Sequence, residues 1–146
     1  MNRVWLLFLT VLYLGCTPPY ESETYKNLSR DDKIMFEKYM IQGKEVYDIN
    51  CINCHMDNGN GLPGIMPPLA NADFLEQNQS AIPCLLRTGT KDTLLVNGRK
   101  YPPEMPDHNL TNLEMAEVLT YINNSWGNEF GFLKVKDIDK LLEKCK

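Results

Sequence analysis

Three observations on the 146-residue sequence predict a mostly helical domain. First, the clearest apolar periodicities have helical spacing, and the best of them begins with a capping box formed by Thr111 and Glu114. Second, the segments between these patterns are rich in Gly and Pro, which favour loops. Third, the pattern departs from helix most clearly at residues 94–101, which are predicted to be a loop or a short hairpin, with Asn97-Gly98 as a turn signal.

The N-terminal part is predicted to be a targeting segment and a linker, not part of the domain. Residues 1–15 combine Arg3 with an apolar run that is shorter than the roughly 20 residues a membrane-spanning helix needs. The run ends at Gly15-Cys16, which resembles the lipobox of bacterial lipoproteins, although Tyr13 departs from the usual Leu. We therefore expect lipidation of Cys16 and a polar tether over residues 16–30; the alternative is an ordinary signal peptide with a chance Cys.

Five helices are expected in the rest of the chain, and Ser29 or Asp31 could cap the first of them. Gly43 lies inside this first helix, where it costs about 1 kcal/mol relative to Ala, and close contact with another helix would explain it. The last helix is short and amphipathic and belongs to a C-terminal extension over residues 131–146. The five expected helices cover residues 29–48, 72–77, 82–88, 111–125 and 137–144.

The first helix leads into Cys51-Ile52-Asn53-Cys54-His55, which fits the Cys-x-x-Cys-His motif of covalent haem attachment. At this spacing the two thiols match the two vinyl groups of a haem, and His55 would be the proximal ligand of the iron. Half of a zinc site and a redox dithiol also use Cys-x-x-Cys. A zinc site needs more ligands than His108 and the scattered cysteines offer, and a thioredoxin-like dithiol needs a preceding strand where a helix is predicted.

Two more residues are candidates for the surroundings of the iron. The backbone carbonyl of Pro67, in the Gly- and Pro-rich loop after His55, could accept the N–H of the His55 imidazole and fix the orientation of the ring. Met105 lies in a proline-rich irregular loop, which can direct a side chain at a metal, and is our candidate for the sixth ligand. His108 is its rival. The other methionines lie in helical patterns, close to His55 or in the targeting segment.

Two of the five cysteines are left when lipid and haem are assigned. These are Cys84 and Cys145, and an exported protein permits their pairing. We expect a disulfide that fastens the terminal helix across the domain. Closing a loop of about 60 residues would contribute roughly 4 kcal/mol on the chain-entropy model. The alternative is two unpaired cysteines.

Taken together, these motifs resemble a class I monohaem cytochrome c domain over residues 31–130. The resemblance implies an all-α fold whose N- and C-terminal core helices cross, with Gly43 and Tyr47 against Val118 and Tyr121, around one covalently bound haem c. It also implies iron held by His55 and Met105. Candidates for contacting the haem propionates are Arg87, Asn97, Arg99, Tyr101 and Trp126. The matching motifs are Gly43-x-x-x-Tyr47, Cys51-x-x-Cys54-His55, Gly59-x-Gly61-x-Pro63-Gly64, Pro67-Pro68-Leu69, Val96-Asn97-Gly98, Met105-Pro106, Val118-x-x-Tyr121 and Ser125-Trp126-Gly127-Asn128.

The expected function is that of a one-electron carrier, not an enzyme, in a respiratory or dehydrogenase electron-transfer chain. The expected redox partner is a terminal oxidase, a nitrite reductase or a periplasmic dehydrogenase. We expect an exported protein, on the periplasmic or cell-surface side of a membrane that it meets through the lipid anchor. The formal net charge of -4, with no basic run, argues against nucleic acid as a partner. The alternative function is a haem-based small-ligand sensor or a peroxidase-like enzyme in which Met105 is displaceable.

Overall fold

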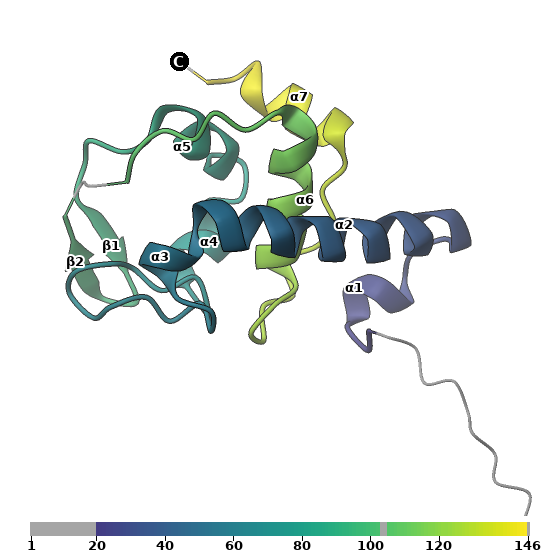
Figure 1. Ribbon diagram of the computed structural model, residues 1–146, viewed down its shortest axis with the longest axis horizontal. Coiled ribbons are helices and arrows are strands. Elements are labelled where there is room, and N and C mark those ends of the chain that lie inside the picture. The colour runs from purple at the N-terminus through teal and green to yellow at the C-terminus, as the bar shows by residue number, and fades with distance from the viewer. Residues whose placement is uncertain (1–19, 103–104, 146) are drawn as a thin grey trace, which may run out of the picture.

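A computed structural model describes residues 20–102 and 105–145 of the chain. The predicted signal segment, Cys16 and residues 17–19 of the expected tether lie outside this part. The described chain is mostly helical, with one small hairpin (Figure 1), so the predicted all-α class is confirmed. Its elements are α1 (Glu23–Lys26), α2 (Arg30–Asn50), α3 (Ile52–His55), α4 (Asp73–Gln77), α5 (Ile82–Thr88), β1 (Leu94–Val96), β2 (Arg99–Tyr101), α6 (Asn112–Asn123) and α7 (Val135–Leu142).

The longer helices begin where their capping residues predict. Ser29 caps α2 by accepting a hydrogen bond from the backbone N–H of Asp32 at 3.2 Å. The capping box of α6 is formed as predicted, since Thr111 Oγ1 accepts from the N–H of Glu114 and Glu114 Oε2 accepts from the N–H of Thr111. Ends were harder to place than starts: α2 runs two residues further than expected and α6 stops two residues earlier.

Helices α2 and α6 cross at Gly43, and this contact organises the fold (Figure 1). A β-carbon at position 43 would lie 2.1 Å from the backbone oxygen of Glu117 and 2.9 Å from the β-carbon of Tyr121. Tyr47, one turn further along α2, is completely buried, as is Val118 on α6. The glycine inside the first helix is therefore explained by the close approach of a second helix, and the expected crossing of the core helices is confirmed.

The C-terminal extension folds back onto this pair of helices. Ile138 of α7 is fully buried and packs in the main core. Before α7, Lys134 Nζ reaches Asp32 Oδ1 near the start of α2 at 2.6 Å, which links residues that are 102 positions apart. The extension is therefore attached to α2 at one end, while α7 packs against both α6 and α5.

The chain before α2 is more ordered than a tether over residues 16–30 would be. Tyr25 of α1 is buried, and its ring centroid lies 5.6 Å from that of the fully buried Phe36. Tyr20 packs on the same Phe36 ring at 5.3 Å. Polar residues separate these aromatic side chains along the sequence, so no apolar run indicates that they gather in one cluster. The expectation of a simple linker was therefore wrong for residues 20–28.

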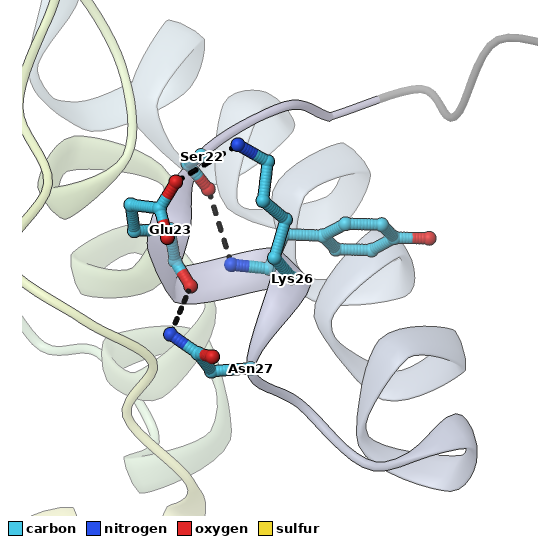
Figure 2. Close-up of polar contacts among 5 residues, drawn as sticks. Ser22, Glu23, Lys26 and Asn27 are labelled. Carbon is cyan, nitrogen blue, oxygen red and sulfur yellow. Dashed lines mark hydrogen bonds and ion pairs between the residues drawn. The ribbon is translucent and has the colours of Figure 1, made fainter.

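Side-chain contacts within α1 show how such a short helix is held (Figure 2). Ser22 Oγ accepts from the backbone N–H of Tyr25, and Lys26 pairs with Glu23 at 2.8 Å. At the other end, the amide of Asn27 donates to the Glu23 carbonyl at 2.9 Å. These contacts pair polar groups that a single helical turn leaves open, so the buried Tyr25 ring does not have to hold the helix alone.

Residues 94–101 form a hairpin, which the sequence left open as either a loop or a hairpin. Strands β1 and β2 pair antiparallel, and the turn residues Asn97 and Gly98 both have positive φ, of 49° and 72°. Asn97 and Asp73 exchange two side-chain-to-backbone hydrogen bonds, of 2.7 and 3.0 Å, which join the hairpin to the start of α4. In residues 20–102 and 105–145, no helix has both the length and the apolar composition of a membrane span.

Candidate functional site

The attachment motif lies at the C-terminal end of α2, where the chain turns into the single-turn helix α3. Cys51 is the residue between the two helices, and its carbonyl accepts the N–H of His55 at 2.9 Å. Cys51 is buried and Cys54 is exposed, yet both side chains line one cavity together with His55. One helical turn thus gathers the two thiols and the imidazole on the same side of the chain.

The His55 ring is held by the loop that follows it. Its Nδ1 lies 2.9 Å from the carbonyl oxygen of Pro67, so the ring N–H donates to that carbonyl and leaves Nε2 for a metal. Burial lowers the pKa of His55, because the charged ring is disfavoured away from water. The site therefore keeps the neutral imidazole that metal ligation requires.

Gly61 allows this loop to bring the Pro67 carbonyl back toward His55. Its φ of +57° is in the left-handed region, and a β-carbon there would lie 2.4 Å from the oxygen of Met66 and 2.5 Å from that of Pro67. Its N–H also donates to the His55 carbonyl at 3.0 Å. The glycine is thus required by the same turn that orients the imidazole.

The cavity is lined mainly by apolar side chains from widely separated parts of the chain. Met105 and His108 line it together with the attachment motif, which keeps both as candidates for the second axial position. An apolar cavity whose lining includes two thiols, an imidazole and a thioether fits a covalently attached haem. Other lining residues are Ile65, Pro67, Pro68, Leu69, Phe74, Leu75, Ile82, Leu85, Leu86, Leu94, Val96, Tyr101, Leu119 and Ile122.

The loop that carries Met105 is attached to the end of α5. The Met105 carbonyl accepts from the N–H of Thr90 at 3.0 Å, and the N–H of His108 donates to the Leu86 carbonyl at 2.9 Å. Gly89 lies between these two contacts with a φ of +68°, and a β-carbon there would be 2.6 Å from the Met105 oxygen. The sequence shows these glycines but does not show which backbone each one approaches.

Of the five residues considered for the propionates, the structure places only Tyr101 in the cavity lining. Arg87 donates to the side chain of Asn112 at 2.7 Å, and the Trp126 indole N–H donates to the Asp57 carbonyl at 3.0 Å. Asn97 is occupied by its bonds to Asp73, as described above. Arg99 is exposed and approaches Gly64. Long-range polar contacts explain these placements, and sequence spacing does not reveal such contacts.

The two other interpretations of Cys-x-x-Cys find little support in this geometry. The described residues contain no group of three or more His, Cys, Asp or Glu side chains arranged to hold a metal ion. Burial raises the pKa of the Cys51 thiol to about 12, which disfavours the thiolate that dithiol exchange needs. A thioether carries no charge, so a buried Cys51 is compatible with haem attachment. A helix, not a strand, precedes the motif.

Cys84 and Cys145 are joined in the structure by a disulfide that spans 61 positions, with their α-carbons 5.5 Å apart. The bond connects α5, which lines the cavity, to the residue that closely follows α7. The remaining cysteines of the described chain are the two in the attachment motif.

Comparison with known proteins agrees with this site. A family model described as cytochrome c matches residues 40–126, which include the attachment motif and Met105. A cytochrome c-552 of Thermus thermophilus is 35% identical over 91 residues, which are 59% of this chain and 69% of that protein. A cytochrome c subunit of a quinone-dependent alcohol dehydrogenase from Gluconobacter oxydans is 32% identical over 103 residues. That match covers 68% of this chain and 21% of the subunit.

Proposed function

Because the chain belongs to the cytochrome c family, in which a covalently bound haem c carries electrons, we propose that Cys51 and Cys54 attach the haem and that His55 and Met105 are its axial ligands. Membership of the family makes this an electron-transfer protein that exchanges electrons with redox partners. One observation supports the residue assignments above all. Cys51, Cys54, His55 and Met105 line one apolar cavity, and the Pro67 carbonyl orients the imidazole.

Each of these residues has a distinct chemical task. When bound, the haem supplies an iron that gains and loses a single electron. A neutral imidazole on one side and a thioether on the other favour the reduced iron more than two imidazoles would, and therefore raise the potential. The apolar lining would keep water from the metal, and the resemblance to class I cytochromes c implies that the haem edge near the attachment cysteines is exposed, where a partner can approach.

Replacing Met105 with Ala tests the axial assignment. The oxidised wild-type protein should show the weak sulfur-to-iron charge-transfer band at the red end of its spectrum. The Met105→Ala variant should lose this band, and its reduction potential should fall. His108→Ala is the matched control from the same loop and the same cavity, and it should keep the band. A band that survives Met105→Ala would show that Met105 is not the ligand.

A second function, small-ligand sensing or peroxidase-like chemistry, rests on the presence of His108 beside Met105 in the cavity lining. A polar side chain there could assist a ligand that displaces the thioether. Carbon monoxide distinguishes the two functions, because a firmly six-coordinate carrier reacts with it slowly at neutral pH. Rapid binding of carbon monoxide to the reduced wild-type protein would favour the sensor.

For the cellular setting, we propose export and a lipid anchor at Cys16, supported by the Gly15-Cys16 pattern after an apolar run. Cys16→Ser should move the protein from the membrane fraction to the soluble fraction. If the variant still sediments with membranes, the anchor is not the lipid on Cys16. This experiment needs only fractionation and an immunoblot, so it is independent of the haem assignments.

For the electron donor, we propose a dehydrogenase on the same side of the membrane, supported by the similarity to alcohol dehydrogenase cytochrome c subunits. A terminal oxidase or a nitrite reductase would then accept the electron. Stopped-flow reduction of the purified protein by a candidate dehydrogenase tests the donor, with the oxidised Cys16→Ser form as the soluble reagent. Rapid reduction by the dehydrogenase supports the proposal, and slow reduction that does not depend on its concentration contradicts it.

A further inference from the structure

Helix α5 joins the haem cavity to the C-terminal extension. Its buried residues Ile82 and Leu86 line the cavity. Cys84, between them in sequence, is linked to Cys145. The same short helix is therefore tied to the extension by Cys84 and contributes to the cavity wall through Ile82 and Leu86. Figure 1 shows α5 close to the C-terminal end of the chain.

The inner contacts of α5 reach the backbone of the loop that carries Met105. The carbonyl of Leu86 accepts from His108, and Thr90, two residues past the helix, donates to the carbonyl of Met105. At Gly89 the segment after α5 approaches the segment that carries Met105 so closely that a β-carbon on Gly89 would overlap the Met105 oxygen. Movement of α5 away from the core would therefore pull on the loop at Met105 itself and at His108, three residues after it.

The outer contacts of α5 fix it to α6 and α7. Besides the disulfide, Arg87 donates to Asn112 at 2.7 Å, and Asn112 in turn donates to Asp139 of α7 at 2.6 Å. Helix α7 is itself held in the core by Ile138, which is fully buried. All of α7 lies beyond residue 126, where the match to the cytochrome c family ends.

We propose that α7 and the Cys84–Cys145 disulfide are a positioning element that keeps residues 105–108 against α5 and so keeps Met105 on the iron. The proposal rests on the axial role proposed for Met105. A loop of this kind opens by local unfolding, and its opening is easier if the helix that supports it can move along with it. The disulfide prevents that movement, because it ties α5 to a helix held in the core.

Imidazole added to the oxidised holoprotein measures this opening, because it binds the iron only when Met105 has left. Its apparent affinity therefore follows the fraction of molecules with an open loop. In the Cys84→Ser/Cys145→Ser double variant the apparent affinity should rise by about tenfold, and the charge-transfer band should be lost at a correspondingly lower imidazole concentration. An affinity equal to that of the wild type would overturn the proposal.

Tyr25→Leu is the control for a general loss of stability. Tyr25 is buried and packs on Tyr20 and Phe36, and its cluster contains no residue of α5 or of residues 105–110. Its imidazole affinity should remain within about twofold of the wild type, even though its global stability falls. An equal rise in the control and in the double-serine variant would reduce the disulfide to a general stabiliser and refute the positioning role.

A second preparation avoids dependence on the folding of the serine variant. Folded wild-type holoprotein is treated with a phosphine reductant, its two half-buried thiols are blocked with a small alkylating reagent, and the iron is reoxidised. The same rise in imidazole affinity is expected, and an unchanged affinity counts against the proposal. Failure of the underlying ligand assignment would show itself separately, since the charge-transfer band would then persist in Met105→Ala.

Discussion

At the scale of single residues, glycine determines how closely the backbone can approach His55. Gly61→Ala would place a β-carbon against the carbonyls of Met66 and Pro67, so we expect a loss of about 1–3 kcal/mol from overpacking in addition to about 1–2 kcal/mol for the left-handed backbone. Denaturant unfolding of the oxidised holoprotein measures the sum.

Gly98→Ala is the matched control for that measurement. Gly98 also has positive φ, but nothing lies within 4 Å of the position a β-carbon would take. The Gly98→Ala variant should lose only the stability that the left-handed backbone conformation costs, about 1–2 kcal/mol in the free energy of unfolding. Equal losses in the two variants would mean that the contact with the Pro67 carbonyl adds nothing to stability.

Residue-scale prediction from the sequence succeeded where chemistry depends on local spacing. The interval from Cys51 to His55 fits on one helical turn, so sequence alone indicates that these side chains act together. The hydrogen-bond partner of Arg87 could not be predicted in the same way. A guanidinium near the cavity was expected to face the propionates, but Asn112, 25 positions away, provides its acceptor instead.

At the scale of elements, the α2–α6 crossing depends on Gly43 having no side chain. Gly43→Ala would force the helices apart, since a β-carbon 2.1 Å from the Glu117 oxygen meets backbone that cannot rotate away. We expect a loss of about 3 kcal/mol or more in the free energy of unfolding, at or above the upper end of ordinary overpacking. Thermal and denaturant unfolding of the holoprotein would both detect it.

Glu45→Ala, at an exposed position two residues further along the same helix, is the control for an alanine that lies outside the packed crossing. It should leave stability within about 0.5 kcal/mol of the wild type. If Gly43→Ala lost no more stability than this control, α2 and α6 would have to move apart more easily than the close backbone contact indicates.

Elements were predictable to the extent that their ends carry local signals. Ser29 and the Thr111–Glu114 pair marked the starts of α2 and α6 because a cap is made by residues within one turn. Helix α1 also has a capping residue, Ser22, but one turn is too short for the periodic pattern that makes a helix visible in the sequence. The contact of Tyr25 with Phe36 adds to its stability, and this tertiary contact is not contained in the local sequence.

At the scale of the whole molecule, the ion pair between Lys134 and Asp32 connects the two ends of the domain. The hydrogen bond from Lys134 holds the pKa of Asp32 below its ordinary value of 3.8. A carboxyl with a lowered pKa in the folded state stabilises the fold at pH values above the ordinary one, and this contribution disappears as the pH falls through the lowered value. The stability difference between wild type and Asp32→Asn should therefore be constant near neutral pH and shrink below about pH 4.

Denaturant unfolding at a series of pH values checks this, with Asp31→Asn as the neighbouring control. Asp31 is exposed and belongs to the same first turn of α2, so it shares the helix terminus but not the ion pair. If the wild type stayed more stable than Asp32→Asn by the same free energy of unfolding even in strong acid, the lysine would not act through the charge of Asp32.

The position of α1 also bears on how the molecule faces its surroundings. The aromatic cluster fastens the incoming chain to the first turns of α2, while Cys51 follows the last turn of the same helix. The cluster reaches α2 at Phe36, fifteen residues before Cys51, which at 1.5 Å per residue is about 22 Å along the helix. If Cys16 carries the proposed lipid, the chain from the membrane therefore enters the domain well away from the attachment cysteines. A redox partner could then reach those cysteines without meeting the anchored segment.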